Sequence, residues 1–252
     1  MEDIVGRLRA AGCVFAEDEA RLLEEAAAGP ELTGLVARRV AGEPLEQVLG
    51  WAEFCGLRIA VEPGVFVPRR RTEWLVRQAA ALRPRTVVEL CCGSGAVAAA
   101  LRSLLPGLAV TAADVDPVAV RCARRNLPGA DVLEGDLDAP LPPALRGRVD
   151  VLVANAPYVP TGDIALMPPE ARDHEPRVAL DGGTDGLDVA RRVVACAPRW
   201  LAAGGTVLVE TSTRQAPALA AAARAAGLEP RVTADEDLGG TSVVAVLRTD
   251  AG

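Results

Sequence analysis

Residues 86–100 read TVVELCCGSGAVAAA, and this stretch decides the fold that the rest of the chain completes. The apolar run at 86–90 predicts a buried strand, because continuous hydrophobic strands are typical of sheets covered on both faces. Gly93 and Gly95 then mark a loop in which backbone without Cβ atoms can approach a ligand. The alanine-rich residues that follow predict a helix whose free N–H groups face that loop.

The strand–helix alternation continues along the chain. Residues 117–126 and 186–201 have the pattern of helices, and Pro117 suits a first helical turn. Repeated units of this kind predict an α/β fold with a doubly wound, mostly parallel sheet. The last two strands follow each other without a helix, which predicts an antiparallel hairpin at the sheet edge. Further strands are expected at 108–113, 130–135, 149–154, 206–211, 229–234 and 242–248.

Three regions are expected along the chain. Residues 1–50 predict a small domain of short helices, punctuated by glycine and proline. Residues 51–71 predict a β-hairpin linker, with the turn at Pro63-Gly64 and an extended run resuming at 65–67. Residues 72–252 form the larger, ligand-binding domain.

The composition limits the classes of function. The 252 residues carry a net charge of −7, which disfavours stable nucleic-acid binding, and the basic cluster Arg69-Arg70-Arg71 is interpreted as a solvated helix start. The six cysteines show no CxxC pair and His174 is the only histidine, so we expect no metal site. No apolar run approaches the roughly 20 residues that span a bilayer, and the amino terminus does not resemble a signal peptide. We expect a cytoplasmic protein that does not bind membranes.

The loop after the first sheet strand predicts a nucleotide-like cofactor. Asp114 ends the second strand, where its carboxylate can accept both hydroxyls of a ribose. The layout also fits the G-x-G-x-x-A dinucleotide pattern, so NAD is a competing interpretation. Glu89, inside the strand end, and Asp136-Leu137, after the third strand, favour S-adenosylmethionine. A cationic sulfonium tolerates that much nearby acid, whereas a pyrophosphate gains little from it.

Asn155-Ala156-Pro157-Tyr158 follows the fourth strand and predicts a site for the methyl acceptor. An amide nitrogen is a poor nucleophile, and two acceptors aimed at its N–H groups would fix it. The Asn155 side-chain oxygen and the Ala156 carbonyl can supply them. Pro157 stiffens the turn and Tyr158 offers a flat face to a planar group. The competing interpretation is a simple turn in which Asn155 bonds its own backbone.

At this point most of the chain resembles the protein-(glutamine-N5) methyltransferases that modify peptide chain release factors. The segments that carry the resemblance are Gly42-Glu43-Pro44-Leu45, Phe54-x-Gly56-Leu57, Val67-Pro68-Arg69, Thr72-Glu73, 89–95, 153–160 and 175–187. The resemblance implies a class I, Rossmann-like S-adenosylmethionine-dependent methyltransferase fold, with a seven-stranded sheet and an antiparallel edge strand. It implies S-adenosyl-L-homocysteine as product and a release factor as protein partner, held partly by the N-terminal helices. A monomer is favoured.

The resemblance also implies which residues form the site. Residues 155–158 would hold the glutamine of the Gly-Gly-Gln loop of the release factor. The cofactor would be bound by Glu89, Cys91, Cys92, Gly93, Ser94, Gly95, Asp114, Val115, Asp136, Leu137 and Asn155.

The chain departs from the family pattern at several positions. Ala156 replaces the first proline of Asn-Pro-Pro-Tyr, and Arg70-Arg71 replace a proline–acid pair. Cys91 stands where glycine is usual, and Leu137 where an aromatic residue often faces adenine. These departures leave open an acceptor other than glutamine, such as adenine N6 or a small metabolite, or a vestigial non-catalytic protein. His174 is expected beside the site in a structural role.

Overall fold

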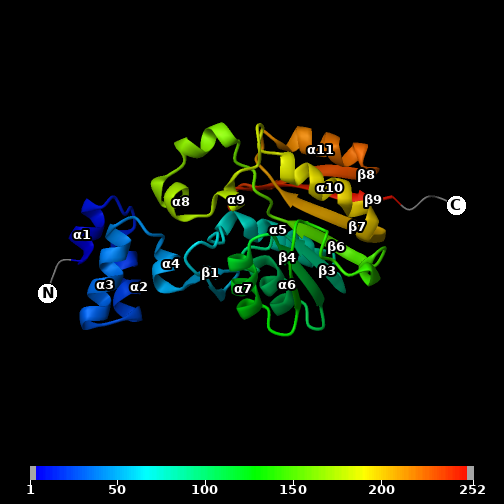
Figure 1. The fold of residues 1–252 in the computed structure, drawn as a ribbon. Coiled ribbons are helices and arrows are strands. Elements are labelled where there is room, and N and C mark those ends of the chain that lie inside the picture. Colours follow the sequence, from blue (N-terminus) through cyan, green and yellow to red (C-terminus); the bar gives the residue numbers. More distant parts are fainter. Residues whose placement is uncertain (1–3, 249–252) are drawn as a thin grey trace.

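The computed structural model describes residues 4–248, so residues 1–3 and 249–252 of the expected first and last regions lie outside the described residues. Residues 4–49 form the helices expected there, at one end of the molecule and away from the sheet (Figure 1). They pack around a core of their own that includes Leu8, Leu23 and Val36. These helices are α1 (Ile4–Ala10), α2 (Ala16–Ala26), α3 (Gly29–Val40) and α4 (Leu45–Leu49).

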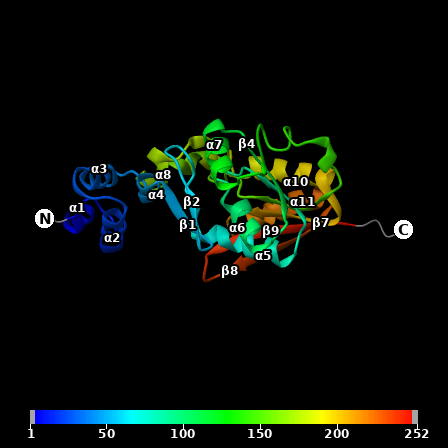
Figure 2. The same ribbon diagram turned by 90° about the horizontal axis from the view of Figure 1, so that it is seen from below.

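A β-hairpin follows the helices, but its turn lies earlier than expected. β1 (Trp51–Phe54) pairs with β2 (Leu57–Ala60) in antiparallel register. The turn is Cys55-Gly56, where both residues have positive φ, +51° and +74°. A two-residue turn of this hand matches the twist of the strands. Pro63-Gly64 also turns the chain, with Val65 N donating to Glu62 O at 3.0 Å, but residues 65–67 form no strand, so the predicted hairpin across that turn is wrong. Figure 2 shows the hairpin between the N-terminal helices and the sheet.

The central sheet of the described residues has seven strands in the order β5-β4-β3-β6-β7-β9-β8. Strands β3 to β7 run parallel, and β9 is antiparallel to both of its neighbours. The α/β prediction is confirmed, and the antiparallel strand lies one place in from the edge strand β8. The strands are β3 (Thr86–Leu90), β4 (Ala109–Asp114), β5 (Asp131–Glu134), β6 (Val149–Ala154), β7 (Leu201–Glu210), β8 (Leu228–Asp235) and β9 (Gly240–Leu247).

Helices cover both faces of the sheet (Figure 1). The helices α5 (Glu73–Ala81), α6 (Ala96–Leu104) and α7 (Pro117–Asn126) share one core with the sheet. The helices α10 (Asp188–Trp200) and α11 (Ala216–Ala225) share the other. Burial on both faces explains the continuous apolar strands in the sequence. Over residues 4–248, no helix has both the length and the apolar character needed to cross a bilayer.

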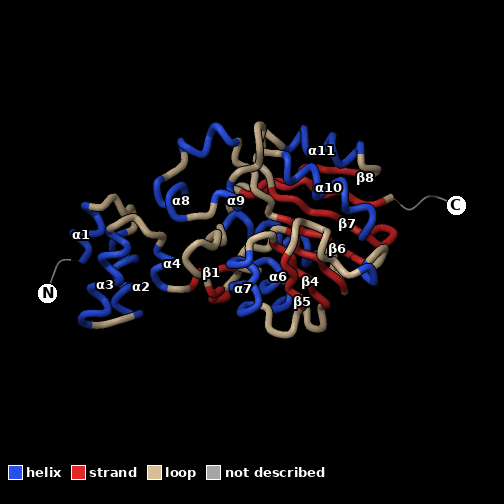
Figure 3. The backbone as a smooth tube through the Cα atoms, viewed as in Figure 1, coloured by secondary structure: helices blue, strands red, loops and turns tan. Residues whose placement is uncertain are grey.

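The segment after β6 forms short helices that the sequence did not lead us to expect. It contains η3 (Thr161–Leu166), α8 (Pro169–His174) and α9 (Arg177–Leu180). In Figure 3 this arm leaves the sheet and extends toward α4. An ion pair of 2.9 Å between Arg39 Nη1 and Glu170 Oε1 joins α3 to α8. The N-terminal helices are therefore tied to the arm that follows residues 155–158, which we call the acceptor segment.

Candidate functional site

A cavity of about 390 Å³ opens at the carboxyl ends of the parallel strands. It lies where β3 and β6 are neighbours and the strand order reverses, the usual ligand position in open α/β sheets. The cavity brings together nearly all of the predicted site residues: Glu89, Cys91, Cys92, Gly93, Ser94, Asp114, Val115, Asp136, Leu137, Asn155, Ala156, Pro157 and Tyr158. Its size suits a nucleoside-sized ligand.

The two loop glycines have different physical roles. Gly93 has φ of +53°, lines the cavity, and a Cβ added there would meet nothing within 4 Å. Gly95 has φ of +74°, but its added Cβ would lie 2.8 Å from Leu127 Cδ1. Only Gly93 therefore leaves room for a ligand in the way the sequence predicted. Gly95 is not among the lining residues, and its missing side chain lets α6 pack against Leu127.

Cys91 occupies a left-handed conformation with φ of +54°. A side chain in this region costs roughly 1–2 kcal/mol, which explains why glycine suits this position. Burial raises the pKa of both the Cys91 and Cys92 thiols above the ordinary range, and nearby carboxylates add to the rise. Both thiols are free and stay protonated, so neither is suited to act as a nucleophile.

Two carboxylates line the predicted cofactor side of the cavity, the buried Glu89 and the partly buried Asp114. Burial raises the pKa of Glu89 to about 8, although its Oε2 accepts a hydrogen bond of 2.9 Å from Ala98 N. Asp114 accepts from Gly93 N at 2.8 Å and from Asp116 N at 2.9 Å, and burial raises its pKa as well. A cationic ligand would favour the ionised form of both groups.

The remaining cofactor candidates lie at the rim and floor of the cavity. Asp136 Oδ2 accepts from Arg192 Nη2 at 2.7 Å, and both side chains are largely exposed. Leu137 is buried, with φ of +50°, and belongs to the core beneath the cavity. Val115 is half exposed. The cavity is therefore acidic at one side and apolar at its floor.

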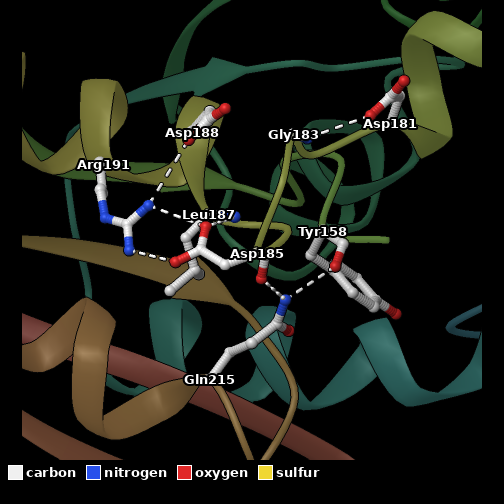
Figure 4. Close-up of polar contacts among 8 residues, drawn as sticks. All are labelled: Tyr158, Asp181, Gly183, Asp185, Leu187, Asp188, Arg191 and Gln215. Carbon is white, nitrogen blue, oxygen red and sulfur yellow. Dashed lines mark hydrogen bonds and ion pairs between the residues drawn. The ribbon is translucent and has the colours of Figure 1, made fainter. Parts of the chain in front are cut away.

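The acceptor segment is held from below by Gln215. Its Nε2 donates to the carbonyl oxygens of Tyr158 and Asp185, each at 2.9 Å (Figure 4). Gly186 permits this arrangement, since a Cβ there would lie 2.3 Å from both the Gln215 amide nitrogen and the Tyr158 carbonyl. A Cβ at Gly182 would lie 2.7 Å from the Pro157 carbonyl. Residues 182–186 thus pack backbone against backbone on the acceptor segment, which gives that part of the sequence pattern a physical reason.

The ends of the acceptor segment contact residues near the arginine cluster. Asn155 Nδ2 donates to Thr72 Oγ1 at 3.3 Å. Burial raises the pKa of Tyr158 to about 12, and Arg71 acts against that rise. Arg71 Nε lies 3.4 Å from Glu210 Oε1, and Arg69 Nη2 lies 2.6 Å from Glu175 Oε1.

These contacts correct the interpretation of the arginine cluster. Arg69 and Arg71 line the cavity and pair with the buried carboxylates of Glu175 and Glu210, so neither is only a solvated charge, although the Arg71 side chain remains 45% exposed at the start of a helical turn. Arg70 is not a lining residue. His174 also lies outside the lining residues. It ends α8 and approaches Gly42, where an added Cβ would lie 3.8 Å from its Nε2.

Several polar residues beside the cavity were not predicted from the sequence. Thr72, Glu175 and Glu210 are buried polar residues beside the cavity, and Gln215 supports the acceptor segment. Glu210 ends a parallel strand, as Asp114 does, so the same signal could have identified it. Glu175 lies in an irregular segment, and its partner Arg69 is far away in the sequence. Its burial could not be read from periodicity.

Comparisons with known proteins agree with this geometry. The family described as Methyltransferase small domain matches residues 56–167. A methyltransferase structure from Pyrococcus furiosus superposes with a TM-score of 0.60 at 17% identity, covering 86% of this chain and 100% of that one. The fold is that of the class I methyltransferases. The matched methyltransferase family uses S-adenosylmethionine as its cofactor, so the dinucleotide interpretation is not supported.

Curated relatives are considerably closer in sequence. A release factor glutamine methyltransferase from Geobacter sulfurreducens is 44% identical over 189 residues, which cover 73% of this chain and 66% of that protein, just under two thirds of its length. A 4-amino-L-phenylalanine/4-methylamino-L-phenylalanine methyltransferase from Streptomyces pristinaespiralis is 38% identical, covering 79% of this chain and 71% of that protein. A release factor glutamine methyltransferase from Deinococcus radiodurans is 38% identical, covering 91% of this chain and 90% of that protein. The chain belongs to the family of release factor glutamine methyltransferases.

Proposed function

We propose that this chain transfers a methyl group to the amide nitrogen of a glutamine in the Gly-Gly-Gln loop of a peptide chain release factor. The observation that carries the proposal is the placement of Asn155 and Ala156 in the same cavity as Glu89 and Asp114. The residues of the acceptor clamp and those for the cofactor line one cavity, which is what direct transfer between two bound molecules requires.

The cofactor end of the cavity is assigned to the acidic residues and the glycine loop. Asp114 would accept the ribose hydroxyls, and Gly93 would let the backbone approach the ligand. Glu89 would compensate the positive charge of the methionine part, with Leu137 against the adenine. S-adenosylmethionine supplies a methyl group activated by a sulfonium centre. Cys91, Cys92, Ser94, Val115 and Asp136 complete the walls of this end.

The acceptor end is assigned to the segment after β6. The Asn155 side-chain oxygen and the Ala156 carbonyl would each accept one N–H of the target amide and so orient its lone pair. Because Pro157 and Tyr158 are fixed by Gln215 and residues 182–186, the clamp is held rigid before the acceptor arrives. The amide proton leaves after transfer, so no strong base is needed in the cavity.

The regions outside the cavity are assigned by position. The ion pair between Arg39 and Glu170 links the N-terminal helices, residues 1–50, to the arm that follows the acceptor segment. A partner protein bound by those helices would therefore be placed near the cavity mouth. The hairpin region, residues 51–71, joins this part to the catalytic region, residues 72–252. We place the protein in the cytoplasm as a monomer that does not bind nucleic acid stably.

The proposal is tested by incubating the protein with isotope-labelled S-adenosylmethionine and a purified release factor. Mass mapping of the Gly-Gly-Gln peptide should locate the label on the glutamine side chain. An unlabelled glutamine, with methyl on another residue of the release factor, would contradict the assignment.

A second acceptor class, an aromatic amine, has its own support. The Streptomyces pristinaespiralis relative is named for a free aromatic amino acid, and Ala156 departs from the usual proline of the clamp. Arg71 at the cavity would suit the carboxylate of such a substrate. Competition between 4-amino-L-phenylalanine and the release factor in one methylation assay separates the two.

A further inference from the structure

Two buried polar residues on the acceptor side of the cavity, Thr72 and Glu210, have no role in the proposed transfer. Asn155, after β6, donates to Thr72, Thr72 lies beside Glu210 at the end of β7, and Arg71 pairs with Glu210. Thr72 and Glu210 are 4% and 3% exposed. Buried polar groups that lie in contact need a consistent pattern of donors and acceptors.

Glu210 lies at one end of this row of polar residues. When its carboxylate is ionised, it can only accept hydrogen bonds. Its Oε1 faces Arg71 Nε at 3.4 Å, and its Oε2 has no hydrogen-bond partner among residues 4–248. Burial raises the pKa of Glu210, while Thr72, Arg71 and Tyr158 face it and lower that pKa. Arg71 therefore supplies a counter-charge that favours the ionised form of this buried carboxylate.

Asn155 lies at the other end, where the orientation of its side-chain amide matters. Its side-chain oxygen and nitrogen are almost the same size, but only the oxygen can accept a hydrogen from the target amide. In the structure Asn155 Nδ2 donates to Thr72 Oγ1 at 3.3 Å, which leaves the oxygen for the cavity. The opposite orientation would present an N–H group to an N–H group.

We propose that Thr72 and Glu210 are positioning residues that fix the direction of the Asn155 amide, so that its oxygen faces the acceptor nitrogen. This inference rests on the proposed N-methyl transfer. The ionised Glu210 accepts a hydrogen bond from the Thr72 hydroxyl. The Thr72 oxygen then accepts in turn from Asn155. An acceptor at that point admits only the NH₂ end of Asn155.

The Glu210→Gln variant tests the direction directly, because it replaces an acceptor with a group that can donate. The amide introduced by this substitution, donating to Thr72, would turn the Thr72 hydroxyl toward Asn155 and favour the flipped orientation. Thr72→Val removes the hydroxyl, and Thr72→Ser keeps it. Thr86→Val, at the amino end of β3 and outside the cavity, is the matched control for a threonine-to-valine change.

In methylation assays we expect kcat to fall roughly 10- to 100-fold in Glu210→Gln and Thr72→Val, which is the usual scale of misorienting a reacting group. Cofactor affinity should stay near the wild-type value in both. Thr72→Ser should recover kcat relative to Thr72→Val. Equal loss in Thr72→Ser and Thr72→Val, with melting temperatures near wild type, would overturn the inference because the hydroxyl would not matter.

A second measurement does not depend on the acceptor. The sequence contains only two asparagines, Asn126 and Asn155, so isotope-labelled asparagine gives two side-chain NH₂ groups in an NMR spectrum. Asn126 donates to Ala60 O at 2.9 Å and Ser94 O at 2.8 Å and serves as the internal reference. Both Glu210→Gln and Thr72→Val should move the Asn155 signals and leave those of Asn126 in place.

The two measurements separate the inference from the proposed function. Unchanged Asn155 signals in Glu210→Gln would overturn the positioning role, whatever the activity. A wild-type protein that leaves the release factor unmethylated, with Asn155 still responding to Glu210→Gln, would remove the proposed acceptor and leave the positioning role standing.

Discussion

The guanidinium carbon of Arg71 lies 5.7 Å from the centroid of the Tyr158 ring. A cation at this distance is attracted to the face of an aromatic ring. One face of Tyr158 is therefore already occupied, and a planar acceptor group has only the other face to stack on. Arg71 is also paired with Glu210, so the ring, the cation and the buried carboxylate form one cluster.

The first prediction concerns the charge balance of this cluster. Tyr158 is the only tyrosine, so tyrosinate absorbance reports on it alone. Its pKa of about 12 is raised by burial and by Glu210, and lowered by Arg71. Glu210→Gln should bring the pKa down toward the ordinary value, and Arg71→Met should push it beyond the measurable range. Equal titration of the two variants would show that the charges are not coupled to the ring.

The same shift has a consequence for stability. Because Tyr158 has an ordinary value of 10.0 when unfolded and about 12 when folded, the unfolded chain loses its proton first. The stability that the neutral phenol contributes is complete below pH 10 and is lost as the pH rises through the folded pKa. Denaturant melts between pH 9 and pH 12 measure this, with Tyr158→Phe as the control that lacks the effect.

The second prediction concerns the affinity for the cofactor. The pKa of Glu89 is raised to about 8 in the free protein, so much of it is protonated at pH 7. A cationic ligand favours the carboxylate, and binding should release a proton. The affinity should then rise by up to about tenfold per pH unit below pH 8 and level off above it. Calorimetry in buffers of different ionisation enthalpy measures the release, and Glu89→Gln should abolish it.

In the cofactor-free protein the raised pKa of Glu89 has the opposite effect, because stability falls as the pH rises. The folded chain holds the Glu89 proton up to about pH 8, whereas the unfolded chain loses it near 4.5. This contribution to stability is complete below pH 4.5 and declines as the pH rises toward 8. A cofactor-free wild-type protein whose pH–stability curve matches that of Glu89→Gln would argue against a raised pKa.

The third prediction concerns the backbone at Cys91. Replacing Cys91 with glycine removes the cost of a side chain at φ of +54°, offset in part by the entropy of an added glycine. Cys91→Gly should leave stability unchanged or raise it by up to about 1 kcal/mol, with cofactor binding retained. Cys91→Val should lose stability, since β-branched residues tolerate this conformation poorly. Thermal melts decide, and a destabilised Cys91→Gly would contradict the assignment of strain.

The fourth prediction separates the two loop glycines. Alanine at either position bears a similar conformational cost, because both have positive φ. Gly95→Ala adds a clash with Leu127 and should lower the melting temperature more than Gly93→Ala does. Gly93→Ala should instead lose more cofactor affinity, because its methyl enters the cavity. Thermal melts and cofactor titration of both variants, with Gly95→Ala combined with Leu127→Ala as a partial rescue, test the contrast.

The main elements of the catalytic region could be predicted from the sequence. Strands such as 86–90 and 149–154 are apolar over most of their length, and helix 117–126 begins at a proline. Their signals are local, because burial on both faces and helix-start chemistry act on neighbouring residues. The cofactor loop and Asn155–Tyr158 could be located for the same reason, since ligands meet a parallel sheet where its strands end.

Other features could not be placed from the sequence pattern. The hairpin was expected to turn at Pro63-Gly64, but β1 pairs with β2 across Cys55-Gly56. Gly95 was taken for a ligand-facing residue, and only its contact with Leu127 revealed a packing role.

The fold class, a doubly wound sheet, could be predicted from the sequence, as could the positions of an acidic loop after the first sheet strand and of Asn155 after the fourth. The tertiary structure alone decided how that asparagine is held. Thr72 and Glu210 are separated by more than half of the chain, and only the fold brings the half-exposed Arg71 against the buried Glu210. A buried carboxylate must be paired with a counter-charge or with hydrogen-bond donors, and burial is a property of the folded chain.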